Sequence, residues 1–408
     1  MPQTALESPR LAIDGGRAIR SRQLAPWPHF EPDEIEAAAA VLSSAKINYR
    51  TGEEGRLFEK EFATFAGCKH GVAVANGTVA LELALQALGI GAGDEVVVPS
   101  RTFIASASCA VMRGAIPVIA DVDATSQNIT ADTIRPHLTS RTKAIIAVHL
   151  AGWPCDMDPI LALARDRGIK VIEDCAQAHG ATYKGRPVGS LGDAAAFSFC
   201  QDKIMTTGGE GGMLTINEDS VWERARSFRD HGTRDDACRK DQQSGGFRWI
   251  HDSFGTNWRL TEMQSAIGRV QLRKLPDWAE IRGRNASLLT KGLSKCPGLR
   301  VTLPPNDIAH SYYKYYVFVR PECLKAGQDR ERIMAAINAE GIPCFCGICS
   351  EIYLEKAFPE LLRPQRRMTI AKKLGETSLM FLVHPTLSEQ DMLETCQAVE
   401  KVMNAAAK

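Results

Sequence analysis

The stretch FSFCQDKIMTTGGEGG, residues 197–212, places one lysine between two apolar runs. Lys203 follows the first run and precedes a glycine-rich turn that leads into the second run, residues 213–216. At the edge of a buried sheet, burial and cationic neighbours lower the pKa of a lysine, so that its free amine can attack a carbonyl group and form a Schiff base. Because lysines are rarely buried, a solvated loop lysine is the alternative when this stretch is taken alone.

Composition and charge exclude several classes of protein. The 408 residues suffice for two domains with a substantial core. With 49 basic and 48 acidic residues the chain is almost neutral, so neither nucleic acid nor an anionic membrane is expected as its main partner. Residues 1–20 are polar and interrupted by proline and glycine, and no window approaches about 18 consecutive apolar residues. We therefore expect a cytoplasmic protein without a transmembrane helix.

Short apolar runs rich in Val, Ile and Ala recur along the first half of the chain, with amphipathic stretches between them. The runs lack a clean alternation, which is typical of strands covered on both faces. Strand–helix–strand repetition predicts an α/β fold with a mainly parallel seven-stranded sheet and helices on both faces. The seven predicted strands are residues 70–75, 95–100, 116–122, 144–150, 170–176, 194–199 and 211–216.

The pattern changes in the last third of the chain. Residues 258–293 have a long helical periodicity, and beyond Pro297 a strand at 312–319 and helices at 329–340 and from 389 predict a smaller C-terminal α+β domain. We place the boundary near residue 285. The predicted division is an N-terminal segment 1–30, a large α/β domain 31–285 and a small domain 286–408.

Two further polar features fit a pyridoxal phosphate site, which needs an amine, an acid at the pyridine nitrogen and a phosphate-binding turn. Asp174 follows the apolar run that begins at residue 170, where an ionised carboxylate would keep the ring nitrogen protonated. Gly77 and Thr78 end one strand and begin a helix, and a helix N-terminus binds anions. Each feature has an ordinary alternative, since Asp and Gly-Thr are also common helix caps.

Two patterns that suggest other functions are set aside. Residues 89–94, GIGAGD, follow a predicted helix and precede a strand, whereas a dinucleotide-binding fingerprint follows a strand and opens a helix. Of the twelve cysteines, residues 344–349 contain three but lack the further ligands of a zinc site. We therefore predict no metal site. We interpret residues 89–94 as a turn that follows a helix.

Taken together, these motifs resemble the DegT/DnrJ/EryC1/StrS sugar aminotransferases, a branch of the fold-type I pyridoxal phosphate enzymes. The resemblance extends from about residue 24 to residue 402, and any one of its motifs is weak while their order along the chain is specific. Residues 207–210 depart from the pattern, because many relatives have one glycine fewer before the glutamate. The matching segments are residues 76–78, 99–103, 121–123, 173–180, 197–212 and 255–259.

The resemblance implies a role for each matching residue that would hold the cofactor. Lys203 is similar to the lysine that binds pyridoxal phosphate and carries the proton, and Asp174 to the partner of the ring nitrogen. Gly77, Thr78 and Ser198 are similar to the residues that bind the phosphate.

Three further residues extend the match around the ring and beyond the subunit. Phe103 resembles the aromatic residue that stacks on the pyridine ring, and Gln177 the residue that touches its 3-hydroxyl. Asn257 resembles a residue that reaches the phosphate of a neighbouring subunit, which implies a homodimer with shared sites.

The implied reaction is a ping-pong transfer of an amino group from glutamate, or glutamine, to a keto sugar, nucleotide-linked in many relatives, or to a keto cyclitol. Residues 48–51 and 311–314 fall where relatives contact substrate, although an aromatic cluster such as the second is also common in cores. A sugar dehydratase or deoxygenase on the same fold usually has histidine in place of the lysine, so Lys203 argues against it. A pyridoxal-phosphate-binding regulator would need an added basic DNA-binding domain, and a cysteine desulfurase an activated cysteine.

Overall fold

The computed structural model describes residues 10–233 and 251–408, so the first nine residues of the predicted N-terminal segment lie outside it. Its centre is a seven-stranded sheet in the order β1-β9-β8-β5-β4-β2-β3. The strands are β1 (His70–Val74), β2 (Glu95–Pro99), β3 (Ile116–Ala120), β4 (Thr142–Val148), β5 (Lys170–Asp174), β8 (Ala194–Ser198) and β9 (Gly212–Ile216). Strands β8, β5, β4, β2 and β3 pair in parallel, and β9 runs antiparallel to both of its neighbours. The predicted mainly parallel sheet is confirmed.

Helices cover both faces of this sheet. Successive residues of strand β1 pack into two different hydrophobic cores, one on each face. In β1, Val72 and Val74 pack into the largest hydrophobic core, whereas Ala73 between them packs into a separate core with Phe58 and Phe62. Side chains of a strand point alternately to its two faces, so the two cores lie on opposite sides of the sheet. The helices that contribute to them include α2 (Glu54–Phe65), α3 (Gly77–Ala87), α4 (Ala105–Met112), α6 (Met157–Arg165), α7 (Asp219–Arg229) and α9 (Glu262–Leu293).

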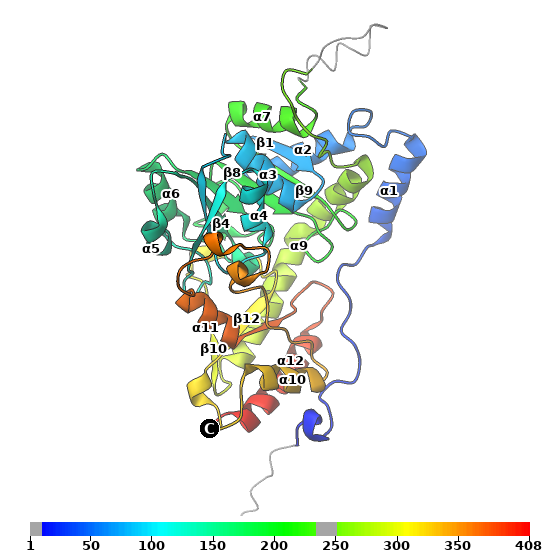
Figure 1. The fold of residues 1–408 in the computed structure, drawn as a ribbon. Coiled ribbons are helices and arrows are strands. Elements are labelled where there is room, and N and C mark those ends of the chain that lie inside the picture. The colour runs from blue at the N-terminus through cyan, green and yellow to red at the C-terminus, as the bar shows by residue number, and fades with distance from the viewer. Residues whose placement is uncertain (1–9, 234–250) are drawn as a thin grey trace, which may run out of the picture.

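The C-terminal part has its own sheet and its own hydrophobic core (Figure 1). Helix α9 passes from the large sheet into this part, and Ala286 is the first of its residues in the C-terminal core. The predicted boundary near residue 285 therefore falls inside a continuous helix, and the division into domains stays a prediction. The elements here are β10 (Leu299–Val301), β12 (Tyr315–Val319), α10 (Arg330–Ala339), α11 (Thr369–Thr377), β13 (Ser378–Phe381) and α12 (Glu389–Ala406).

Strand β12 begins three residues later than the sequence predicts. Tyr312 has a φ of 47°, a left-handed conformation that no strand residue adopts, so extended pairing starts only at Tyr315. The remaining elements are α1 (Pro32–Ser44), α5 (Ala131–Ile134) and a small sheet of β6 (Thr182–Tyr183), β7 (Arg186–Pro187) and β11 (Ile308–Ala309).

The segment before α1 connects the C-terminal part to the large sheet. Arg20 pairs with Asp391 of α12 at 2.8 Å, and from there the chain runs alongside the molecule to α1, which packs on α9 (Figure 1). Within residues 10–233 and 251–408, every helix is too short or too polar to cross a membrane.

Candidate active site

Three segments that carry predicted site residues meet at one edge of the central sheet. Strands β1, β5 and β8 run in the same direction and end at Val74, Asp174 and Ser198. The carboxyl ends of such strands face one edge, where ligands bind in α/β proteins. The N-terminus of α3, the segment after Asp174 and the loop at residues 199–211, here called the Lys203 loop, therefore lie together.

Asp174 ends β5 as a buried carboxylate with two hydrogen-bond donors. Ser106 Oγ donates to Oδ2 at 2.9 Å, and the Ala176 amide donates to Oδ1 at 3.1 Å. Burial raises the pKa of Asp174, while the two hydrogen bonds and the charges of Lys203 and His149 oppose the rise. A carboxylate buried in this way is stabilised by a further cationic group that reaches it.

Lys203 is held through its backbone, and its side chain is only 17% exposed. Its carbonyl accepts a 2.8 Å hydrogen bond from Trp27 Nε1. Its Nζ lies 3.7 Å from Asp202 Oδ1 and 5.1 Å from the centroid of the Tyr313 ring. The first distance exceeds a hydrogen bond, so the amine is near Asp202 without being tied to it.

The turn before α3 has the geometry of an anion site. Asn76 caps the helix, because its Oδ1 accepts from the Val79 amide at 3.0 Å. Gly77 and Thr78 are the first two residues of α3, so their amides have no acceptor within the helix and add to its positive N-terminal end. A Cβ on Gly77 would lie 2.6 Å from Cβ of Ser198, which shows how closely this turn packs on the end of β8.

The other three predicted site residues lie in three different environments. The Phe103 side chain, between β2 and α4, is 63% exposed, so its ring is free to cover a ligand. Gln177 is tied through its Oε1, which accepts from the Ala151 amide at 2.8 Å. Asn257 is exposed, and its backbone pairs with Asp230; among the described contacts none joins it to Lys203.

Four residues around the Lys203 loop were assigned no role from the sequence, although Tyr313 belongs to the segment 311–314 that was expected to contact substrate. Tyr313 donates its hydroxyl to Asp202, and burial together with that carboxylate raises the pKa of Tyr313. Burial by itself would raise the pKa of Asp202, but the charge of Lys203 and the hydrogen bond from Tyr313 outweigh it and lower this pKa. The Asp202 carboxylate therefore stays ionised near the Lys203 amine. Trp27 is 176 residues from Lys203 along the chain, which no local pattern reveals. His179 is fully buried beside the phenylalanines of the sheet, and burial lowers its pKa to about 3.

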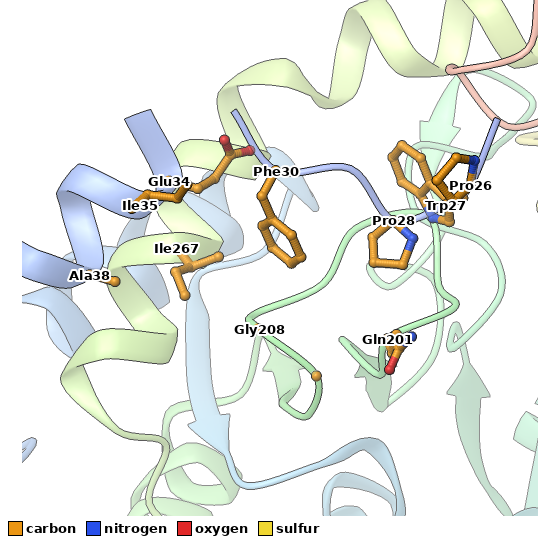
Figure 2. A pocket seen from close by; sticks show the side chains of 11 residues that line it. Pro26, Trp27, Pro28, Phe30, Glu34, Ile35, Ala38, Gln201, Gly208 and Ile267 are labelled. Atoms are coloured by element: carbon orange, nitrogen blue, oxygen red, sulfur yellow. The ribbon is translucent and has the colours of Figure 1, made fainter. Parts of the chain in front are cut away.

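Two cavities border the Lys203 loop on the side of the N-terminal segment. Figure 2 shows the first, of about 640 Å³, with Phe30 and Ile267 facing the loop that carries Gln201 and Gly208. The second, of about 530 Å³, adjoins Asp202 and Trp27. Neither is lined by Lys203 or Asp174, so both lie beside the predicted catalytic residues rather than around them.

Two groups of potential metal ligands occur among the described residues, and in one of them the carboxylates of Glu31, Asp33 and Glu34 all accept hydrogen bonds from Lys274. His149, Glu173 and Cys175 form one buried group. His149 Nε2 meets Glu173 at 3.0 Å and its Nδ1 accepts from the Cys155 amide, while Glu173 also accepts three amides of residues 189–192. This group therefore ties β5 to its neighbouring loops.

Comparison with known proteins gives a consistent result. Residues 28–400 match the DegT/DnrJ/EryC1/StrS aminotransferase family. The chain is 39% identical to GDP-perosamine synthase of Caulobacter vibrioides over 349 residues, 85% of this chain and 89% of that protein. An aminotransferase structure from Psychrobacter cryohalolentis is 52% identical, with a TM-score of 0.91 over 94% of this chain and 99% of its own. A putative sugar aminotransferase from Streptococcus pneumoniae, solved in its PMP form, is 26% identical with a TM-score of 0.85, over 94% of this chain and 100% of its own.

The fold and these matches define a pyridoxal-phosphate-dependent aminotransferase of fold type I. The chain belongs to the DegT/DnrJ/EryC1/StrS aminotransferase family, which confirms the family and the cofactor predicted from the motifs.

The residues present fit the cofactor. The buried Asp174 carboxylate can stabilise a protonated ring nitrogen, and the amide-rich turn at Gly77 can bind a phosphate. The exposed ring of Phe103 can stack on a pyridine, and Lys203 supplies an amine in reach of the same edge of the sheet.

Proposed function

We propose that this chain transfers an amino group from glutamate or glutamine to a ketone. The acceptor is a nucleotide-linked keto sugar or a keto cyclitol. The observation that carries the proposal is a lysine amine and a buried carboxylate at the same sheet edge as a helix N-terminus that suits phosphate. The sugar acceptor is supported by the names of two relatives, a GDP-perosamine synthase and a putative sugar aminotransferase.

The roles of the residues follow from their chemistry. When bound, pyridoxal phosphate supplies an aldehyde that takes up the donor's amino group and a ring that accepts the electrons of its Cα–H bond. Lys203 Nζ would hold the cofactor and, once free, would take the proton from the donor's Cα. Asp174 keeps the ring nitrogen protonated, and Ser198 with the first amides of α3 holds the phosphate. Water would supply the keto oxygen with which the donor leaves as a 2-oxo acid, and the same residues would act in reverse on the acceptor ketone.

Covalent mapping tests the central residue. Borohydride reduction of the holoenzyme followed by peptide mapping should leave the pyridoxyl group on Lys203, and Lys203→Ala should abolish turnover. Lys184→Ala is the matched control, because Lys184 is a surface lysine that pairs with Asp158 at 2.8 Å and should leave activity unchanged. Mapping of the group to Lys184 or Lys314 would refute the assignment.

The half-reaction tests the function itself. The wild-type holoenzyme mixed with glutamate or glutamine should change from the pyridoxal to the pyridoxamine absorption spectrum and release a 2-oxo acid. A spectrum that stays unchanged with both donors would exclude them.

Two subunits are proposed to share each site. The exposed Asn257 stands at the start of the segment that leads into α9, on the surface of the single chain, where a second subunit can meet it. A symmetric pair would place two such contacts at one interface.

A further inference from the structure

The second cavity, here called the Lys314 cavity, has walls from three parts of the chain. Residues 20–27 form one wall, Asp202 of the Lys203 loop another, and the C-terminal part the third, through Lys314, Phe345, His384 and their neighbours. Its volume of about 530 Å³ lies within the range of about 300–1,000 Å³ that small-molecule sites occupy. The cavity is therefore large enough for part of a substrate and adjoins the residue next to Lys203.

Lys314 is a half-buried cation in this cavity without a carboxylate in contact. Its Nζ lies 4.8 Å from the centroid of the Tyr313 ring, the same ring that Lys203 approaches at 5.1 Å. Within residues 10–233 and 251–408, Lys314 makes no ion pair, and carboxylates act on it only at longer range, through Asp202. Burial, reinforced by the charges of Arg282 and Lys203 and opposed by Asp202, lowers the pKa of Lys314 to about 8. A half-buried ammonium in this state gains stability from any anion that reaches it.

The other charges around the cavity have partners of opposite charge. Arg20 pairs with Asp391 at 2.8 Å and with Glu394, and the exposed Arg22 lies 3.7 Å and 3.8 Å from the same two carboxylates. Asp202 accepts the Tyr313 hydroxyl and lies near Lys203, so its negative charge is shared with two other groups. Lys314 is thus the cation of this cavity whose charge is left for a ligand.

One further cation, Arg282, lies next to Tyr313 and has no carboxylate partner among the described residues. Arg282 is 1% exposed, its Nε has no hydrogen-bond partner, and it donates only to the carbonyls of Tyr312 and Tyr313, at 3.3 and 3.4 Å. Burial lowers the pKa of His384 to about 3, so this residue is neutral and adds no charge. The local balance favours one added negative charge, and the Asp202 carboxylate on the opposite wall opposes a dianion such as phosphate.

We propose that the Lys314 cavity binds a carboxylate of a transamination substrate, with Lys314 as the residue that recognises it. The inference rests on the proposed function, because it assigns the cavity to a substrate of that reaction. Two sources carry the same chemistry, the side-chain carboxylate of a glutamate donor and a carboxylate on the acceptor sugar. In both cases Lys314 is a specificity-determining residue, and the substrate reaches from the Lys203 amine past Asp202.

Binding of unreactive acids tests the site apart from turnover. Calorimetric titration of the wild-type holoenzyme at pH 7 uses glutarate, which resembles the donor without its amine, and D-glucuronate, a sugar acid without a free amine. Lys314→Gln should weaken binding of the recognised acid about tenfold or more, the value of a hydrogen bond between charged groups, and Lys314→Arg should largely retain it. Lys295→Gln, which removes the charge of an exposed lysine in the same part of the chain, should bind as wild type does.

The two probes separate the two sources. If Lys314→Gln loses affinity for glutarate alone, the cavity binds the donor, and if it loses affinity for glucuronate alone, the cavity binds the acceptor. A loss of affinity for both acids means that the cavity binds each substrate in its own half-reaction. The proposal is overturned if neither acid binds saturably, or if Lys314→Gln binds both as the wild type does while retaining its cofactor spectrum and melting temperature. If the site fails in this way while glutamate still converts the wild-type spectrum, the proposed aminotransfer stands without it.

The pH dependence gives a second readout. The pKa of free Lys314 is about 8, and a bound carboxylate raises it, so binding is strongest below pH 8 and weakens above it. Between pH 7 and 8.5 Asp202 stays ionised, and His384 and Tyr313 stay neutral. Burial lowers the pKa of Arg282 to about 9, above this window. Lys203 is the same in the wild type and in Lys314→Gln, so its contribution cancels when the two proteins are compared. Wild-type affinity for the acid should therefore fall more steeply across the window than that of Lys314→Gln; equal slopes would contradict the role of Lys314.

Discussion

Replacing Gly77 with alanine tests whether the turn before α3 and the end of β8 form one tightly packed phosphate site. A Cβ at this position would lie 2.6 Å from Cβ and 3.1 Å from Cα of Ser198, and 3.0 Å from its Oγ. Two of these atoms are fixed by the backbone of a central strand, so no rotamer change removes the contact. Overpacking of this kind costs about 1–3 kcal/mol.

Relief of the contact requires the helix N-terminus and Ser198 to move apart. That movement lengthens hydrogen bonds to the phosphate, each worth about 1.5–3 kcal/mol because the acceptor is charged. We therefore expect Gly77→Ala to lose about tenfold to a hundredfold in affinity for pyridoxal phosphate, since about 1.4 kcal/mol corresponds to a factor of ten.

Gly283→Ala is the matched control. Gly283 lies in α9, and a Cβ there meets nothing within 4 Å, so the exchange should stabilise the helix by about 0.5–1 kcal/mol. The assay is cofactor titration of the apoenzyme by absorbance, together with the urea midpoint of each apo variant. If Gly77→Ala binds the cofactor as tightly and unfolds at the same urea concentration as wild type, the packing argument is refuted.

Three further predictions follow from single contacts. Asp174→Asn should keep the cofactor but lose activity by orders of magnitude, because an amide cannot stabilise a protonated ring nitrogen; near-wild-type turnover would show that Asp174 is only a structural carboxylate. Mixing Lys203→Ala with Asn257→Ala subunits should restore about one quarter of wild-type activity if sites are shared across a two-fold dimer; no recovery despite proven subunit exchange would mean that each subunit holds a complete site. Phe62→Ala should lower the free energy of unfolding by about 3–5 kcal/mol, because it leaves a cavity among fully buried rings; a urea midpoint equal to that of wild type would contradict this.

Local sequence patterns determined the sheet and the positions of the polar residues at its edge. The apolar runs predicted all seven strands within one or two residues, because strands buried on both faces need continuous apolar sequence. The structure places Asp174 and Lys203 at the edge of the sheet, where polar residues that end such runs are expected.

Contacts between distant segments were decided only by the tertiary structure. Trp27 reaches the Lys203 carbonyl across 176 residues, and Tyr313 reaches Asp202 across 111. Neither contact has a local signal, because both depend on how the N-terminal segment and the C-terminal part pack against the Lys203 loop. The low pKa of Lys314 likewise arises only in the folded chain, where the side chain is half-buried near two other cations and has no carboxylate in contact. Residue type and periodicity reveal which groups a chain carries, whereas the electrostatic state of each group depends on the neighbours that folding brings to it.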